Sequence, residues 1–343
     1  MQLNRRLFIF RGLFVATLTL LAITGGCGGI EDSAATAPDK GTSGGASSDR
    51  PSIVCTTTMI GDITREIVGD LADVQVLFGP TIDPHLFRAT RDDVASLMRA
   101  DLVIYNGFGL EGYLEPHLKR VGETGTPLLP IAESILEDGE AMTDAGVTDP
   151  HVWMNPALWA RTAPAIAASL GATLGADKVS LQALNGRAAT VEHRLLELDA
   201  RSQAAIQTIP EPARILITAH DAFRYFGRRY DVRVEGIQGL STASEGGLQA
   251  IESLVDLIVA SKVPAVFVES TISERNIKAL VEGAAARGQA VKLGGTLHSD
   301  APGAAGTYER MVEHNVNTIA TALGGAPMEP AVVDSQNAPM APH

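Results

Sequence analysis

Hydrophobic and polar positions follow two alternating patterns along the chain. Short runs rich in β-branched residues predict strands, and segments with apolar residues three and four positions apart predict helices. The predicted strands cover residues 53–57, 74–78, 102–105, 214–218, 263–269 and 290–293. Because strands and helices alternate, we predict an α/β fold with parallel sheets flanked by helices.

One segment interrupts this alternation. Residues 177–209 contain no strand pattern and place apolar residues at helical spacing, namely Leu181, Leu184, Ala188, Val191, Leu195 and Leu198. This spacing predicts one long amphipathic helix that ends before Pro210. We therefore predict an N-terminal α/β lobe at 51–176, a connecting helix at 177–210 and a C-terminal α/β lobe at 211–325.

Two helix starts carry capping sequences. Thr90 is followed by Asp92 and Asp93, which predicts a capped start with acidic residues in the first turn. Thr271 and Glu274 are spaced as in a capping box before a further apolar pattern.

The N-terminus has the pattern of an export signal. Three arginines precede an apolar run at 13–23 that is too short to span a bilayer comfortably. Small residues then lead to Cys27, which resembles a bacterial lipoprotein signal with Cys27 as the lipidated residue. Thr24 departs from that pattern, since such signals usually have Leu there. The run 5–9 also resembles a twin-arginine signal.

The two ends of the chain differ in amino-acid composition from the predicted folded body. We predict a lipoprotein-type signal segment at 1–27, a flexible tether rich in Gly, Ser and Ala at 28–50, and a disordered, Pro-rich tail at 326–343. If Cys27 carries lipid, Cys55 has no partner for an intrachain disulfide, and its apolar neighbours predict a buried, inert thiol. The net charge of −13 argues against nucleic acid as a partner.

Three histidines and one aspartate follow predicted strands. His85, His151 and His220 stand in loops or at helix starts near strand ends, and Asp300 follows the last predicted strand. Ligands of parallel α/β sheets bind beyond the carboxyl ends of the strands. Three imidazoles and one carboxylate suit a first-row divalent metal ion.

Motifs around these residues resemble one family. They stand at 83–85 (Asp-Pro-His), 100–107 (Ala-Asp-Leu-Val-Ile-Tyr-Asn-Gly), 149–153 (Asp-Pro-His-Val-Trp), 218–226, 236–239, 266–270 and 297–300 (Leu-His-Ser-Asp). In this order, from about residue 53 to 323, they resemble the metal-binding solute-binding proteins of bacterial ABC transporters (cluster A-I), which serve manganese, zinc or iron uptake.

The resemblance implies a function and a site. It places the family's metal ligands on His85, His151, His220 and Asp300, two from each lobe, with one divalent ion in the cleft. It implies a monomeric, periplasm-facing protein, lipid-anchored to the membrane, that delivers metal to an ABC permease in the inner membrane and is not an enzyme. Manganese or zinc is expected ahead of iron. Residues 137–149 lack the His-rich tract that zinc-specific members often carry.

Two other interpretations remain open at this point. A zinc-dependent hydrolase would need an open coordination position and a positioned base, and the sequence has no His-Glu-x-x-His motif. In a binding protein for another solute, or an adhesin, the histidines would be incidental. Further candidates near the site are His298, as a neighbour of Asp300, and Glu111, Glu245 and Glu269, as carboxylates that orient ligand histidines.

Overall fold

The computed structural model describes residues 50–244 and 246–330. The predicted signal segment with Cys27, nearly all of the predicted tether and most of the predicted tail therefore lie outside the described residues, as does Glu245. Within the described ranges, no helix combines the length and the apolar character needed to cross a membrane.

The first lobe is built on a parallel sheet in the order β2-β1-β3-β4. Its strands are β1 (Ser52–Cys55), β2 (Asp73–Val76), β3 (Leu102–Tyr105) and β4 (Leu128–Pro130). Its helices are α1 (Thr58–Val68), α2 (Arg91–Arg99), α3 (Glu115–Glu123), α4 (Ile131–Ile135), α5 (Pro156–Ala160) and α6 (Thr162–Thr173).

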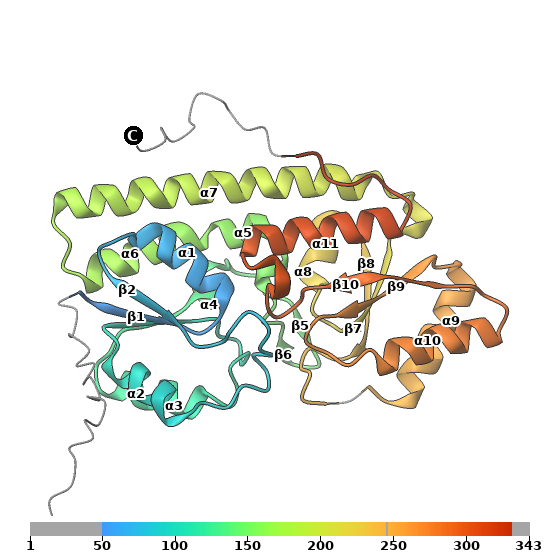
Figure 1. Cartoon of the computed structure of the whole chain (residues 1–343), viewed down its shortest axis with the longest axis horizontal. Coiled ribbons are helices and arrows are strands. Elements are labelled where there is room, and N and C mark those ends of the chain that lie inside the picture. Colours follow the sequence, from blue (N-terminus) through green and yellow to red (C-terminus); the bar gives the residue numbers. More distant parts are fainter. Residues whose placement is uncertain (1–49, 245, 331–343) are drawn as a thin grey trace, which may run out of the picture. The chain divides into compact units, whose positions relative to one another are not determined.

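Side-chain alternation along β1 explains why both faces of this sheet are covered. Ile53 and Cys55 join the core under α1 and α6, whereas Val54 packs with residues of α2 and α3 on the opposite face (Figure 1). Successive residues of a strand point to opposite faces, so a strand that is apolar throughout needs helices on both. Cys55 is fully buried, and burial raises the pKa of its thiol to about 12, as expected of an inert cysteine.

The second lobe has the same kind of architecture. Strand β7 (Ile215–His220) pairs in parallel with β8 (Arg233–Gln238), and β9 (Ala265–Glu269) pairs in parallel with β10 (Lys292–Leu297). Strands β7 and β9 lie side by side. The helices of this lobe are α8 (Arg224–Tyr230), α9 (Leu248–Ser261), α10 (Arg275–Ala286) and α11 (Tyr308–Ala322).

A single long helix, α7 (Lys178–Gln207), links the two lobes and runs along both of them (Figure 1). Its predicted apolar stripe is buried from Leu184 to Leu198, while Leu181 is 37% exposed. One continuous hydrophobic core joins residues of α7 to both lobes. The prediction of two parallel α/β lobes and one connecting helix is confirmed.

Several local expectations were incomplete or wrong. Thr90 caps its helix as predicted, and it also forms a capping box with Asp93, with both reciprocal hydrogen bonds present. The box predicted at Thr271 does not form, because α10 begins only at Arg275 and the Thr271 hydroxyl has no hydrogen-bond partner in the described part of the chain. Strands β4 and β8 were not predicted, since one is three residues long and ends at a proline and the other mixes charged residues with glycine.

The first residues of the predicted tail pack against the body. The Ala326 amide donates to Thr208 Oγ1 at 2.7 Å, and the Met328 amide donates to Asn317 Oδ1 at 2.6 Å. Residues 326–330 therefore lie along α7 and α11, and residues 331–343 lie outside the described residues.

Candidate metal site

The four candidate ligands, separated by up to 215 positions in sequence, meet at one point. His85 lies in the loop between β2 and α2, and His151 directly precedes the short 3-10 helix η1 (Val152–Met154). His220 is the last residue of β7, and Asp300 stands three residues after β10. Their ligand atoms all lie within 4.8 Å of one another, and all four residues are buried. We call this group the His–Asp cluster.

Distances within the His–Asp cluster match those between the ligands of a small cation. The Nε2 atom of His151 lies 3.3 Å from Nε2 of His85 and 3.4 Å from Nε2 of His220. Asp300 places Oδ1 at 3.5 Å from Nε2 of His151 and 3.9 Å from Nε2 of His85, and Oδ2 at 3.4 Å from Nε2 of His220. Tetrahedral bonds of 2.0–2.1 Å separate neighbouring donor atoms by about 3.3 Å. The cluster therefore has the dimensions of a metal coordination sphere.

Two of the imidazoles are oriented by buried carboxylates. His151 Nδ1 lies 2.8 Å from Asp149 Oδ1, and His220 Nδ1 lies 2.6 Å from Glu269 Oε2. A hydrogen bond at Nδ1 directs the Nε2 lone pair toward the centre and raises its basicity. Glu269 was among the carboxylates considered from sequence. Asp149 was missed, although its position two residues before the histidine repeats Asp83 before His85.

The loops carrying the ligands are tied across the two lobes. Trp153 Nε1 donates to the Ser299 carbonyl at 2.8 Å, and the Tyr308 hydroxyl donates to the Trp153 carbonyl at 2.7 Å. Asp83 accepts from the Thr242 hydroxyl at 2.7 Å and from the His85 amide at 2.8 Å. Residues that do not touch the centre thus fix the separation of the four donors.

The charges of the His–Asp cluster are strongly coupled. Burial alone would raise the pKa of Asp300, but His220 and His151 hold it well below its usual range. Burial alone would lower the pKa values of His220 and His151, yet their carboxylate neighbours raise both, that of His220 well above its usual value. Burial lowers the pKa of His85 to about 3, so His85 is neutral. Neither oxygen of Asp300 has a hydrogen-bond partner of normal geometry among the described residues, which leaves both available to a cation.

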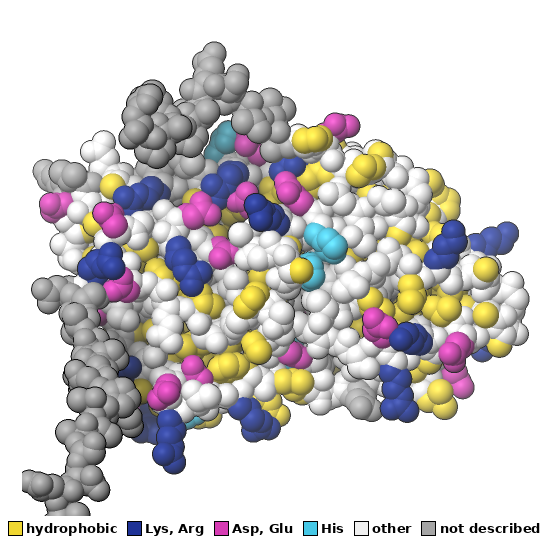
Figure 2. Space-filling model, viewed as in Figure 1, with side chains coloured by type: hydrophobic (Ala, Val, Ile, Leu, Met, Phe, Trp, Pro, Cys, Tyr) yellow, Lys and Arg dark blue, Asp and Glu magenta, His cyan; other side chains and the backbone are white. Residues whose placement is uncertain are grey.

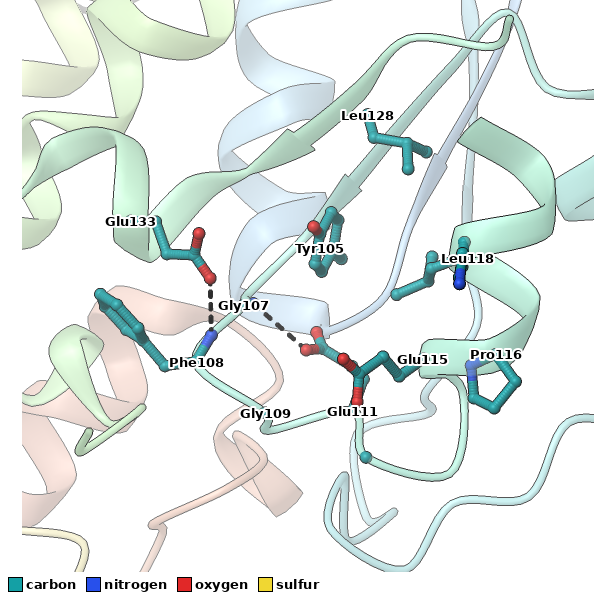
Figure 3. A pocket seen from close by; sticks show the side chains of 12 residues that line it. Tyr105, Gly107, Phe108, Gly109, Glu111, Glu115, Pro116, Leu118, Leu128 and Glu133 are labelled. Atoms are coloured by element: carbon teal, nitrogen blue, oxygen red, sulfur yellow. Dashed lines mark hydrogen bonds between the residues drawn. The ribbon is translucent and has the colours of Figure 1, made fainter. Parts of the chain in front are cut away.

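Glu111 supports the site from a distance rather than by touching a ligand. Its carboxylate accepts from the Thr56 hydroxyl and the Asn106 backbone amide. It also accepts from the Gly107 backbone amide (Figure 3). Asn106 in turn donates from Nδ2 to the Pro150 carbonyl at 3.0 Å, next to His151. The cavity of about 530 Å³ beside Glu111 and Glu133 contains none of the four candidate ligands.

The remaining sequence candidates lie elsewhere. His298 Nδ1 is 3.0 Å from Ser270 Oγ, and within the described ranges His298 makes no polar contact with Asp300. His298 is thus a neighbour of Asp300 in sequence, but its ring is bonded to Ser270 instead. His193 is exposed on α7, and His117 lies on α3, away from the cluster.

Comparisons with known proteins agree with the fold. The family described as zinc-uptake complex component A, periplasmic, matches residues 53–322. The chain belongs to this family. It is 40% identical over 318 residues to the manganese-binding lipoprotein MntA of Bacillus subtilis, covering 91% of this chain and 99% of that protein. It is 37% identical over 294 residues to the zinc-binding protein TroA of Treponema pallidum, covering 82% and 92%.

Solved structures of family members have the same architecture. The periplasmic zinc-binding protein TroA of Treponema pallidum matches with a TM-score of 0.76 at 37% identity, over 80% of this chain and 99% of that chain. Fe(III)-bound YtgA of Chlamydia trachomatis matches with a TM-score of 0.75 at 27% identity, over 81% and 100%. The motif resemblance is confirmed, and the family consists of solute-binding proteins rather than enzymes.

Proposed function

We propose that this protein captures a divalent transition metal outside the cytoplasm and delivers it to the permease of an ABC transporter. The observation that supports this function best is the His–Asp cluster, in which three Nε2 atoms and both oxygens of Asp300 converge in a buried space. Family members are named for the manganese and zinc that they bind. The metal is the cargo, and the protein's task is to hold it reversibly.

His85, His151, His220 and Asp300 are proposed as the ligands. Two belong to each lobe, so the ion would bridge the lobes, and Asp300 can supply one oxygen or two for coordination by four or five donors. Imidazole and carboxylate suit zinc, iron and manganese. The donor spacings near 3.3 Å support zinc, while the 40% identity to a manganese-binding lipoprotein supports manganese. We propose a site that takes either metal, with iron third.

The proposed location rests on the sequence of the N-terminal segment. Cys27 is the proposed lipidation site, and the lipoprotein MntA among the relatives supports an anchored, extracytoplasmic protein. Residues 28–50 would then separate the body from the membrane surface. We propose that the protein acts as a monomer beside its permease.

Uptake and release are proposed to involve local motion. The four donors are 6% exposed or less, so an ion cannot enter without some opening. The core shared with α7 spans both lobes and opposes a wide hinge movement. His85 is the candidate for the moving ligand, because its loop meets the second lobe through single hydrogen bonds, from the Thr242 hydroxyl to Asp83 and from the Gly303 amide to the Pro80 carbonyl.

A hydrolase is not supported. The four donors enclose the centre and leave no exposed position for a substrate, and the relatives are binding proteins. Incidental histidines are not supported either, since three from distant parts of the chain share one centre.

Metal analysis of the protein purified without chelator tests the function. We expect close to one equivalent of manganese, zinc or iron per chain. His220→Ala and Asp300→Asn should each lower affinity more than about tenfold and leave the circular dichroism spectrum unchanged. His193→Ala, which removes an exposed histidine, should bind as the wild type does. Wild-type affinity in the first two variants would refute the ligand assignment.

A further inference from the structure

A second pair of histidines lies outside the His–Asp cluster. His298 follows β10, and His314 stands on α11; their ring centroids are 4.7 Å apart with the planes tilted by 39°. Rings in the His–Asp cluster have centroids 5.2 to 5.9 Å apart. Two imidazoles that bind one ion at 2.0–2.1 Å have centroids roughly 4.5–5.5 Å apart. The His298–His314 pair therefore has a spacing that one metal ion can bridge.

Each ring of the pair has one nitrogen engaged and one without a partner among the described residues. His314 Nε2 lies 2.8 Å from the Thr296 carbonyl, which can only accept, so Nε2 carries the proton and Nδ1 keeps its lone pair. His298 Nδ1 lies 3.0 Å from Ser270 Oγ, and its Nε2 is free. A ring held by one nitrogen, with the other left as a ligand, is the usual arrangement of metal-binding histidines.

The backbone holds the two residues in this relationship. The Asn315 side chain accepts from the His298 amide at 2.9 Å and donates to the His298 carbonyl at 2.7 Å. This clamp fixes the strand end that bears His298 to the helix residue next to His314. The arrangement is thus present without an ion, and binding would not have to order it.

The pair reaches solvent through His314. His314 is exposed, whereas His298 is 7% exposed. Histidine side chains reach the surface on the face that contains α11, among interspersed acidic and basic groups (Figure 2).

We propose that His298 and His314 form a second, surface-accessible metal site, of lower affinity than the His–Asp cluster. Two imidazoles with water in the remaining positions suit zinc, copper(II), nickel or cobalt, and suit manganese poorly. His298 is two residues from Asp300, so an ion held there lies next to a loop that carries a proposed ligand of the main site. The site itself does not depend on the proposed transport function.

Zinc titration of the metal-free mature chain tests the proposal. By calorimetry, we expect one tight equivalent and one weaker equivalent. His314→Gln should weaken the second event at least about tenfold and leave the first unchanged. His193→Gln is the matched control: it removes another exposed histidine, 3.6 Å from Glu197, and should change neither event.

A second measurement separates site loss from misfolding. Zinc is first added to fill the tight site, and substoichiometric Ni²⁺ is then added. In NMR spectra, the ring signals of His298 and His314 should broaden together. A wild type that shows only the tight event, or a second event that His314→Gln leaves unchanged, would overturn the proposal. A wild type that shows only the weak event would refute the proposed function, and the loss of that event in His314→Gln would still support the second site.

Discussion

His220 and Glu269, at the ends of adjacent strands, form a fully buried pair joined by two hydrogen bonds. Glu269 Oε1 accepts a hydrogen bond from the His220 backbone amide at 2.8 Å, and Glu269 Oε2 lies 2.6 Å from His220 Nδ1. Both side chains are 0% exposed. One carboxylate therefore fixes the position and the ring orientation of a proposed ligand.

Glu269→Gln should weaken metal binding by about 10- to 100-fold, because the amide keeps a hydrogen bond but removes the charge that makes His220 basic. Competition against a chromophoric chelator measures the affinity. Glu274→Gln is the control, since Glu274 is exposed and pairs with Lys278 at the surface. An affinity equal to that of the wild type would show that Glu269 is structural only.

Metal affinity should fall as the pH falls, and the fall should begin above pH 6.5. The raised pKa values of His151 and His220 mean that protons occupy them in the metal-free protein at higher pH than in a free imidazole. His85, with a pKa near 3, adds no competing proton in this range. Dissociation constants from about pH 5.5 to 8.5 should give a slope of one to two protons per metal. A flat profile down to pH 6 would contradict the account.

Metal-free protein should lose stability as the pH rises above neutrality. A histidine with a raised folded pKa contributes stability that is complete below its unfolded pKa and is lost as pH passes its folded pKa. His151 and His220 are of this kind, so deprotonation leaves buried Asp300 and its neighbouring carboxylates without compensating charge. Melting temperatures at about pH 6.5 and 9 measure the effect. Metal-loaded protein should not show it, because the cation replaces the protons.

The connecting helix offers a matched pair of adjacent leucines. Leu195 is 1% exposed in the core shared by both lobes, whereas Leu196 is 46% exposed. Leu195→Ala should lower the free energy of unfolding by about 2–5 kcal/mol through lost burial and the remaining cavity. Leu196→Ala should change it by no more than about 0.5 kcal/mol. Urea denaturation distinguishes the two, and equal effects would mean that the helix face is misassigned.

Periodicity was sufficient for the fold class and the long helix. Five strands rich in buried or half-buried apolar residues and the apolar stripe of α7 form patterns strong enough to be recognised. The strand predicted at 290–293 lies instead at Lys292–Leu297, where half of the residues are exposed. The short β4, which ends at Pro130, and the glycine-containing β8 have no such repeat, so they depend on neighbours that only the folded chain provides. Likewise, Thr271 and Glu274 have capping-box spacing, but the chain enters α10 one turn later.

The candidate ligands could be identified from motifs, but their convergence could not. The spacing of residues in the sequence does not predict that His85 lies beside Asp300, because their proximity depends on how α7 positions the two lobes relative to each other. Asp149, which anchors His151, was missed since an aspartate before a proline is common in turns. The His298–His314 pair depends on the packing of α11 against β10, which the sequence does not reveal.

X-ray absorption spectroscopy of the metal-loaded protein tests the central claim most directly. For zinc, the account predicts three imidazole nitrogens at about 2.0–2.1 Å and one or two carboxylate oxygens at about 2.0–2.2 Å, with no sulfur ligand. Asp300→Asn should change the oxygen shell and keep the three imidazoles. A spectrum with fewer than three imidazoles, or with sulfur bound to the metal, would contradict a site made by His85, His151, His220 and Asp300.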